Sequence, residues 1–149
     1  EEVGILQPGE CKGVLKGGCI SVLSKLLERD LNFTFDNCIV FIEDVHESVR
    51  SLFQIFEKMK QAGKLIRIKG LLFGEMIHCS GGATRNFWPD FIEEVIQPFF
   101  SRFNIPIGYN IRSGHGRNEF YLPLGEEVRV RLHPKKSTLD ILSRVSFDK

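Results

Sequence analysis

Apolar residues along the chain follow two periods, one typical of strands and one typical of helices. Residues 38–42 read Cys-Ile-Val-Phe-Ile, a continuous run rich in β-branched residues that predicts a strand buried on both faces. Residues 66–73 alternate and then become wholly apolar, and residues 105–109 form a second short apolar run. We therefore expect strands in these three places.

Three segments have the spacing of an amphipathic helix. The first follows the glycine pair at 17–18, and its apolar positions lie on one helical face. The second spans 49–59, between an N-cap at Ser48 and a stop at Gly63. The third begins at Pro89, a residue suited to a first helical turn, and runs to residue 103.

The end of the chain is expected to add antiparallel strands. Residues 119–132 are interpreted as paired strands that turn at 124–126, because apolar residues alternate with arginines over 128–132. A strand, a helix and a strand joined by short links favour a right-handed parallel crossover. The pattern predicts an α/β fold with a mixed sheet, in a single domain over 1–149 that residues 1–12 enter as a linker.

Composition narrows the function classes without naming one. Of 149 residues, 42% are hydrophobic and 26% are charged, with a net charge of +1, so bulk charge predicts no binding to nucleic acid or membranes. No apolar run approaches the roughly 20 residues that span a bilayer. The first residue is Glu1 rather than methionine, which favours a piece of a longer chain. The four cysteines show no CxxC spacing, so reduced thiols and a cytoplasmic location are expected, with a secreted protein as the alternative.

Two carboxylates, Glu43 and Asp44, follow the buried run 38–42. Carboxylates are seldom buried without a partner, and ligand sites of open α/β sheets lie beyond the carboxyl ends of strands. A carboxylate in this place can orient an imidazole, as the third member of a catalytic triad does. The alternative is that one of the two caps the helix that follows.

His115 lies between Gly114 and Gly116, in a loop that follows the strand at 105–109. Glycine on both sides lets the backbone bend and lets a ligand approach closely. An accessible histidine with a pKa near about 6.5 suits a general base. A loop histidine without a role is the alternative, since a lone histidine is weak evidence.

The sequence shows no convincing nucleophile and no metal site. It contains no G-x-S-x-G elbow; Ser21, Ser80 and Ser113 are candidates by type only, and Ser113 is interpreted as structural. Cys79 follows His78, but adjacent residues seldom aim their side chains at each other. The histidines and cysteines lack ligand-pair spacing, so no metal is expected.

Several short segments, taken in order, resemble the C-terminal domain of the LD-carboxypeptidases and the related microcin-immunity serine peptidases. Each segment alone is unspecific, but the ordered set between Gly13 and Val130 is specific. The first segment, G-G-C-I-S-V-L from Gly17, is similar to the family's G-G-N-L-S-L-L, and the second, I-V-F-I-E-D-V from Ile39, is similar to its L-F-L-E-D strand. The third spans residues 59–74 and contains the pairs A-G, K-G and F-G. The last three are I-P-I from Ile105, S-G-H-G from Ser113 and L-P-L-G from Leu122.

The resemblance implies a triad in the chain order Ser, Glu, His, with Glu43 orienting the general base His115. It places the serine in an N-terminal nucleophile domain that these residues do not include, so that domain is the expected partner and the isolated chain is expected to be inactive. It also implies a swivelling β/β/α-type domain with a mixed sheet and flanking helices. The substrate-binding positions that it indicates are Gly17, Gly18, Cys19, Ser113, Gly114 and Gly116.

The implied reaction is removal of the terminal D-alanine from murein tetrapeptides during cytoplasmic peptidoglycan recycling, by hydrolysis of an L,D amide bond without a metal or other cofactor. The microcin-immunity relatives instead cleave peptide–nucleotide antibiotics. Cys19 stands where the family usually has Asn, which favours a second hypothesis, a non-catalytic peptide- or small-molecule-binding module. A third hypothesis is a structural domain that forms a homodimer through the Phe-rich helix at 89–103.

Overall fold

Strands and helices alternate along the first two thirds of the chain, as expected for an α/β fold. The computed structural model describes residues 3–29, 32–79, 87–116 and 120–142. Its strands are β1 (Gly4–Gln7), β2 (Gly9–Cys19), β3 (Cys38–Val45), β4 (Gly70–Ile77), β5 (Ile107–Tyr109), β6 (Glu127–Leu132) and β7 (Thr138–Ile141). Its helices are α1 (Ile20–Arg29), α2 (Val49–Gln61), α3 (Phe87–Phe91), the π-helix η1 (Ile92–Ile96) and α4 (Gln97–Phe100).

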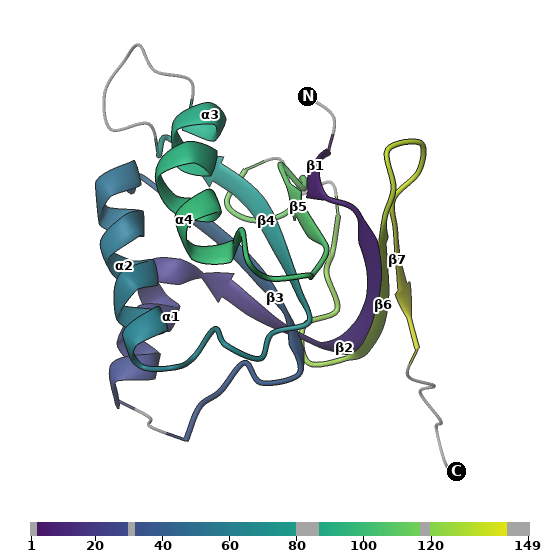
Figure 1. The fold of residues 1–149 in the computed structure, drawn as a ribbon, viewed down its shortest axis with the longest axis horizontal. Coiled ribbons are helices and arrows are strands. Elements are labelled where there is room, and N and C mark those ends of the chain that lie inside the picture. The colour runs from purple at the N-terminus through teal and green to yellow at the C-terminus, as the bar shows by residue number, and fades with distance from the viewer. Residues whose placement is uncertain (1–2, 30–31, 80–86, 117–119, 143–149) are drawn as a thin grey trace.

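The seven strands form one mixed sheet in the order β1-β5-β4-β3-β2-β6-β7. Strands β2 to β5 are parallel neighbours, while β1, β6 and β7 pair in the antiparallel sense. The long strand β2 pairs with β6 through its first half and with β3 through its second half. Only Pro8 separates β1 from β2, yet β1 pairs with β5 across the sheet, so the sheet curls strongly (Figure 1). The predicted mixed-sheet α/β fold is confirmed.

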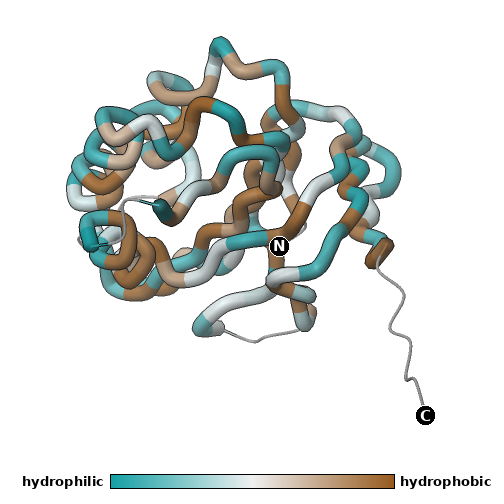
Figure 2. Tube along the Cα trace, turned by 90° about the horizontal axis from the view of Figure 1, so that it is seen from below, coloured by the Kyte–Doolittle hydropathy of each residue, from teal (hydrophilic) through white to brown (hydrophobic). Residues whose placement is uncertain are grey.

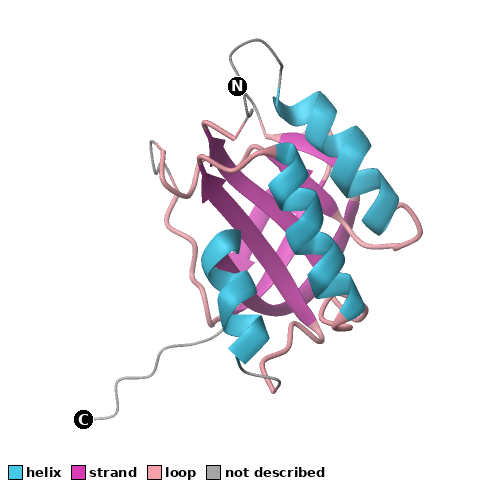
Figure 3. Cartoon of the chain, turned by 90° about the vertical axis from the view of Figure 1, so that its left-hand side faces the viewer, coloured by secondary structure: helices cyan, strands magenta, loops and turns pink. Residues whose placement is uncertain are grey.

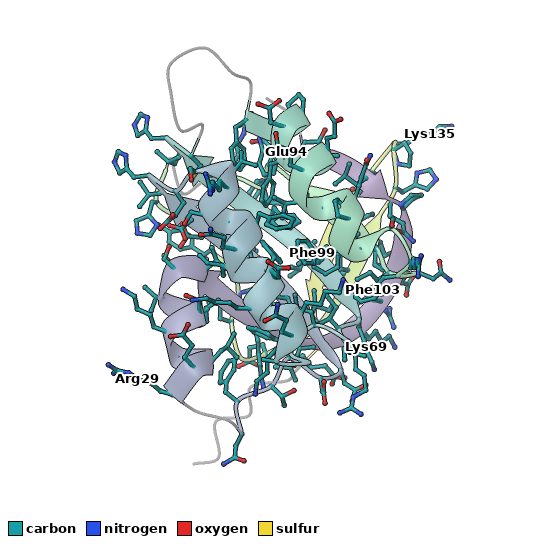
Figure 4. The ribbon with its side chains drawn as sticks, turned by 60° about the vertical axis from the view of Figure 1, so that its left-hand side comes forward. Arg29, Lys69, Glu94, Phe99, Phe103 and Lys135 are labelled. Carbon is teal, nitrogen blue, oxygen red and sulfur yellow. The ribbon has the colours of Figure 1, made fainter. Side chains whose placement is uncertain are left out.

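Helices cover one face of the curled sheet (Figure 3). The core on this side is largely aromatic, and Phe56 on α2 contacts Phe73 of β4 as well as rings at 91–100. Phe99 of α4 points toward α2 (Figure 4), where its ring contacts Phe53. The Phe-rich segment is therefore explained by packing of the helical layer.

A second, smaller core fills the inside of the curl. Hydrophobic stretches run through the middle of the chain trace as well as along its helical coils (Figure 2). On β3, Val40 and Ile42 face the helices, whereas Ile39 and Phe41 face the inner core, as the period of two requires. The other buried members of the inner core are Leu15, Leu72, Val128, Val130 and Leu132.

Two expected boundaries differ at the N-terminal side. Residues 1–12 were expected to form a linker, but 4–7 form β1 and residues from Gly9 onward form β2. The polar pattern misleads here because the first half of β2 leaves most side chains in solvent while its backbone pairs with β6. The strand expected at 66–73 begins only at Gly70, because Ile66 lies in a turn with 66% of its surface exposed.

The C-terminal half shows two more differences. The predicted turn at 124–126 is present, with the Glu126 N–H donating to the Pro123 carbonyl at 3.1 Å, but residues 120–123 before it form no strand. The strand β6 instead forms a hairpin with β7 that turns after residue 132. The third helix begins at Phe87 rather than Pro89, and its middle turn is the π-helix η1. This turn precedes Pro98, which lacks the N–H that a regular α-helix would use. Most of the loop expected at 78–88 lies outside the described residues.

The predicted helix ends are confirmed where they depend on local chemistry. The Ser48 side chain accepts a hydrogen bond from the Ser51 N–H at 3.1 Å, which caps α2. Gly63 follows α2 with φ near +70°, the left-handed conformation that ends many helices. None of the helices in the described ranges combines the length and apolar character that a bilayer crossing requires.

Candidate active site

Glu43 lies near the C-terminal end of β3, with 7% of its side chain exposed. Because side chains alternate along a strand, Glu43 follows Phe41 toward the inside of the curl, away from the helical layer. Its backbone neighbour across the sheet is Cys19, the last residue of β2. The carboxyl ends of two parallel strands therefore meet at this carboxylate, which is where open α/β sheets place ligand sites.

The imidazole of His115 meets this carboxylate directly. The distance from His115 Nδ1 to Glu43 Oε2 is 2.6 Å, within hydrogen-bond range, and 50% of the histidine side chain is exposed. The hydrogen bond from Nδ1 to Glu43, and then the negative charge of Glu43, raise the pKa of His115 above its ordinary value; Asp44 adds a smaller contribution. With Nδ1 engaged, Nε2 is the ring nitrogen left to exchange a proton.

The loop that carries His115 is fitted closely to Glu43. Gly114 has φ near +135°, a conformation that favours glycine, and a Cβ there would lie 3.0 Å from Glu43 Oε2. The loop is tied to β4 at its start, where the Ile111 N–H donates to the Phe73 carbonyl at 3.0 Å. The glycine next to His115 thus permits the close approach on which the 2.6 Å contact depends.

A cavity of about 350 Å³ opens beside the two residues. It brings Gly18, Ser113 and Gly114, three of the predicted substrate-binding residues, together with Glu43 and His115. The other three predicted positions, Gly17, Cys19 and Gly116, do not line it. The remaining lining residues, which sequence reasoning did not identify, are Phe41, Phe120, Tyr121, Leu122 and Leu124.

The missed lining residues belong mostly to one apolar run, F-Y-L-P-L at 120–124. Tyr121 is 94% exposed, and Phe120 and Leu124 are each about half exposed. An apolar run that no helical or strand period can bury is a signal of a contact surface, and it was available in the sequence. This run was expected to belong to a strand pair over 119–132, but it forms no strand.

Gly17 and Cys19 lie on β2 but do not line the cavity. A Cβ at Gly17 would overlap the carbonyl oxygen of Phe41, so this glycine permits close packing of β2 on β3. Burial, followed by the charges of Asp44 and Glu43, raises the pKa of the Cys19 thiol, although the Val22 N–H opposes the shift. The neutral thiol that results is a poor nucleophile.

Asp44 points to the opposite side of β3 and is 2% exposed. Its Oδ2 accepts hydrogen bonds from the Ser21 N–H at 2.9 Å and the Ser21 hydroxyl at 2.5 Å. The hypothesis that Asp44 caps the following helix is therefore wrong: it holds the N-terminus of α1, and Ser48 caps α2. Neighbouring carboxylates on one strand serve two different parts of the structure.

The remaining candidate groups lie at the same edge without forming a further centre. His78 stacks on His46, with ring centroids 5.1 Å apart, rather than facing Cys79. Burial raises the pKa of the Cys79 thiol to about 11, so it is protonated at neutral pH. Within the ranges that the structure describes, no three His, Cys, Asp or Glu side chains are arranged to hold a metal ion.

Comparison with known proteins places this geometry in a family. Residues 12–130 match the model of the LD-carboxypeptidase C-terminal domain. The chain is 27% identical over 124 residues to a Synechocystis protein that carries a carboxypeptidase name, covering 83% of this chain and 40% of the relative. It is 22% identical over 135 residues to a Bacillus subtilis protein named as a probable murein peptide carboxypeptidase, covering 91% of this chain and 42% of the relative.

Solved structures show the same fold. A MccF-like protein from Bacillus anthracis superposes with a TM-score of 0.77 at 22% identity, over 97% of this chain and 44% of that chain. The muramoyltetrapeptide carboxypeptidase from Oxalobacter formigenes superposes with a TM-score of 0.71 at 21% identity, over 93% and 48%. The chain thus spans less than half the length of each of these proteins. It belongs to the LD-carboxypeptidase C-terminal domain family.

Proposed function

We propose that this domain supplies the general base His115 and its orienting carboxylate Glu43 to a serine LD-carboxypeptidase whose nucleophile lies in a separate domain. The observation that carries the proposal is the 2.6 Å contact between His115 Nδ1 and Glu43 Oε2, beside an open cavity. In this contact the two proposed triad members bind each other. The imidazole is half exposed and so remains accessible to the third member, a serine.

The geometry supports the following proposed roles. Glu43 accepts the Nδ1 hydrogen bond, which leaves Nε2 unprotonated and able to take the proton of a serine hydroxyl. Glu43 also stabilises the imidazolium that forms, because its charge favours the protonated ring. His115 then returns the proton to the leaving amine. The serine attacks the carbonyl carbon of an amide, and the C–N bond breaks once the amine is protonated.

The proposed substrate is a murein tetrapeptide, from which the terminal D-alanine is released. This part of the proposal is supported by the family match and by similarity to a Bacillus subtilis protein whose name refers to murein peptides. The proposal of a separate serine domain is supported by the lengths of these relatives, because the chain matches only about two fifths of each. The apolar run at 120–124 on the cavity rim suits contact with such a domain.

The test is release of D-alanine from a murein tetrapeptide. We expect no release by this chain alone, and turnover by the protein that joins it to the nucleophile domain. His115→Ala in the joined protein should lower kcat by about 10³-fold or more. The matched control is His133→Ala, because His133 lies in the β6–β7 turn and does not line the cavity.

Each alternative has its own result. If a peptide–nucleotide amide is cleaved and the tetrapeptide is not, the domain belongs with the microcin-immunity peptidases. One such protein, the microcin C7 self immunity protein MccF solved with glutamyl sulfamoyl guanosine, shares the fold with a TM-score of 0.76 at 18% identity. If peptides bind without release and His115→Ala changes nothing, the domain is a binding module. Wild-type turnover by His115→Ala would refute the general-base role.

A further inference from the structure

The strand β4 carries an irregularity directly opposite Glu43. The Cα pairing between β3 and β4 joins Ile42 to Phe73, then skips and joins Asp44 to Met76. Two residues of β4, Gly74 and Glu75, therefore face the single residue Glu43. This is a β-bulge, a feature that bends a strand and redirects a side chain, often next to active sites.

The bulge changes the face on which Glu75 lies. Phe73 and Met76 both belong to the core under the helices, although residues three apart on a regular strand point to opposite faces. The extra residue absorbs this difference. As a result, the Glu75 side chain can lie on the same side of the sheet as Glu43 and His115.

Contacts confirm where the Glu75 side chain goes. Its Oε2 accepts a hydrogen bond from the Gly116 N–H at 3.1 Å, while the Glu75 N–H donates to the Ser113 carbonyl at 3.0 Å. One residue of β4 thus holds the catalytic loop on both sides of His115. A Cβ at Gly116 would overlap the Glu75 carboxylate, which shows how closely the two fit.

The loop is consequently fixed at two points by two carboxylates. Glu43 lies under Gly114 and bonds the imidazole of His115, and Glu75 lies under Gly116 and bonds its backbone N–H. Catalytic groups lose rate steeply when they move by about 1 Å, so the support of a loop-borne base matters to turnover. A carboxylate accepting a backbone N–H forms a charge-assisted, directional bond.

We infer that Glu75, placed by the bulge in β4, is a positioning residue that holds the His115 loop so that the imidazole stays on Glu43. The effect on turnover rests on the proposed function, whereas the effect on the loop does not. Glu75 does not line the cavity, and it reaches the loop through the Gly116 N–H and the Ser113 carbonyl. The assignment accounts for both the bulge and the glycine at 116.

The experiment compares Glu75→Ala with Glu75→Gln, which removes the charge but keeps an oxygen acceptor for the Gly116 N–H. In this chain, an NMR titration should show the pKa of His115 falling toward about 6.5 in Glu75→Ala and staying closer to wild type in Glu75→Gln. In the protein with the nucleophile domain, Glu75→Ala should lower kcat roughly tenfold to a hundredfold with KM unchanged, and Glu75→Gln should recover most of it. Glu57→Ala on the exposed face of α2 is the control.

A second pair of variants keeps the test decisive if Glu75→Ala alone folds poorly. Gly116→Ala should displace the loop when Glu75 is present, but should add no further loss in the Glu75→Ala background, because the overlapping carboxylate is gone. Equal effects of Ala and Gln at 75, or additive losses in the double variant, would overturn the inference. If the loop coupling holds while His115→Ala keeps turnover, the proposed function fails and the positioning role stands.

Discussion

Replacement of Glu43 by Gln tests the central contact with almost no change in side-chain volume. The wild-type carboxylate is 7% exposed and lies 2.6 Å from His115 Nδ1. Glutamine removes the charge and can present its amide NH₂ to the ring, in which case Nδ1 must accept and the proton moves to Nε2. The imidazole then has the wrong tautomer for a general base.

The magnitudes follow from this geometry. With the tautomer lost, kcat should fall by about 10³- to 10⁴-fold, as expected when the carboxylate of a triad becomes an amide. A hydrogen bond to a charged group contributes about 1.5–3 kcal/mol to stability. Because half of the His115 side chain is exposed to solvent, which screens the pair, we expect a smaller contribution of about 1 kcal/mol. That corresponds to roughly 2–4 °C in Tm for a domain of this size.

The stability effect has a defined pH dependence. The folded-state pKa of His115 is raised, so the wild-type pair stabilises the fold fully below the unfolded pKa of about 6.5. This contribution is lost as the pH rises through the raised folded pKa. Glu43→Gln should therefore destabilise the chain at about pH 5.5 and leave its stability nearly unchanged well above the folded pKa.

The assay combines an NMR titration of the His115 ring with urea unfolding at about pH 5.5 and at a pH well above the folded pKa of His115. The titration of His133, in the β6–β7 turn, serves as the internal control. An unchanged His115 titration in Glu43→Gln, together with a stability difference that does not depend on pH, would show that the two side chains are not coupled in solution. The general-base assignment would then lose its structural support.

Two further substitutions test the framework around the site. Asp44→Ala removes the acceptor of two Ser21 hydrogen bonds at the start of α1. It should lower the free energy of unfolding, measured by urea denaturation, by about 2–3 kcal/mol. A loss below about 0.5 kcal/mol would contradict the role of Asp44 at α1. Gly17→Ala should prevent stable folding, because its Cβ would overlap the Phe41 carbonyl. At Gly18 an added Cβ meets no atom within 4 Å, so Gly18→Ala should cost only about 1–3 kcal/mol of backbone strain. Similar melting curves for the two variants would refute this account.

Much of the parallel core could be predicted because its signals are local. The run 38–42 is apolar in every position, which only a strand buried on both faces requires, and it lies within β3. Ser48 and Gly63 mark the limits of α2 through a side-chain cap and a left-handed residue. The meeting of Glu43 and His115, 72 residues apart, was inferred from family motifs and from the rule that strand ends gather ligand groups.

The parts that were missed depend on partners distant in sequence. The polar start of β2 becomes a strand because β6 offers its backbone groups, and β1 does so because of β5; nothing local to residues 4–12 indicates either pairing. The apolar run at 120–124 was interpreted as a strand because its residue types favour one, yet it lines the cavity. The role of Glu75 needs a bulge, and a bulge is a property of the pairing between two strands.

The site can be understood as the result of regular alternation on β3 and a β-bulge on β4 at one point of the sheet. On β3, alternation sends Glu43 to the cavity and Asp44 to α1. On β4, the bulge breaks alternation and brings Glu75 to the same side as Glu43. The first carboxylate sets the protonation of the imidazole and the second sets the position of its loop. The proposed base, carried on an exposed loop, is thus held by rigid strands, as catalysis requires.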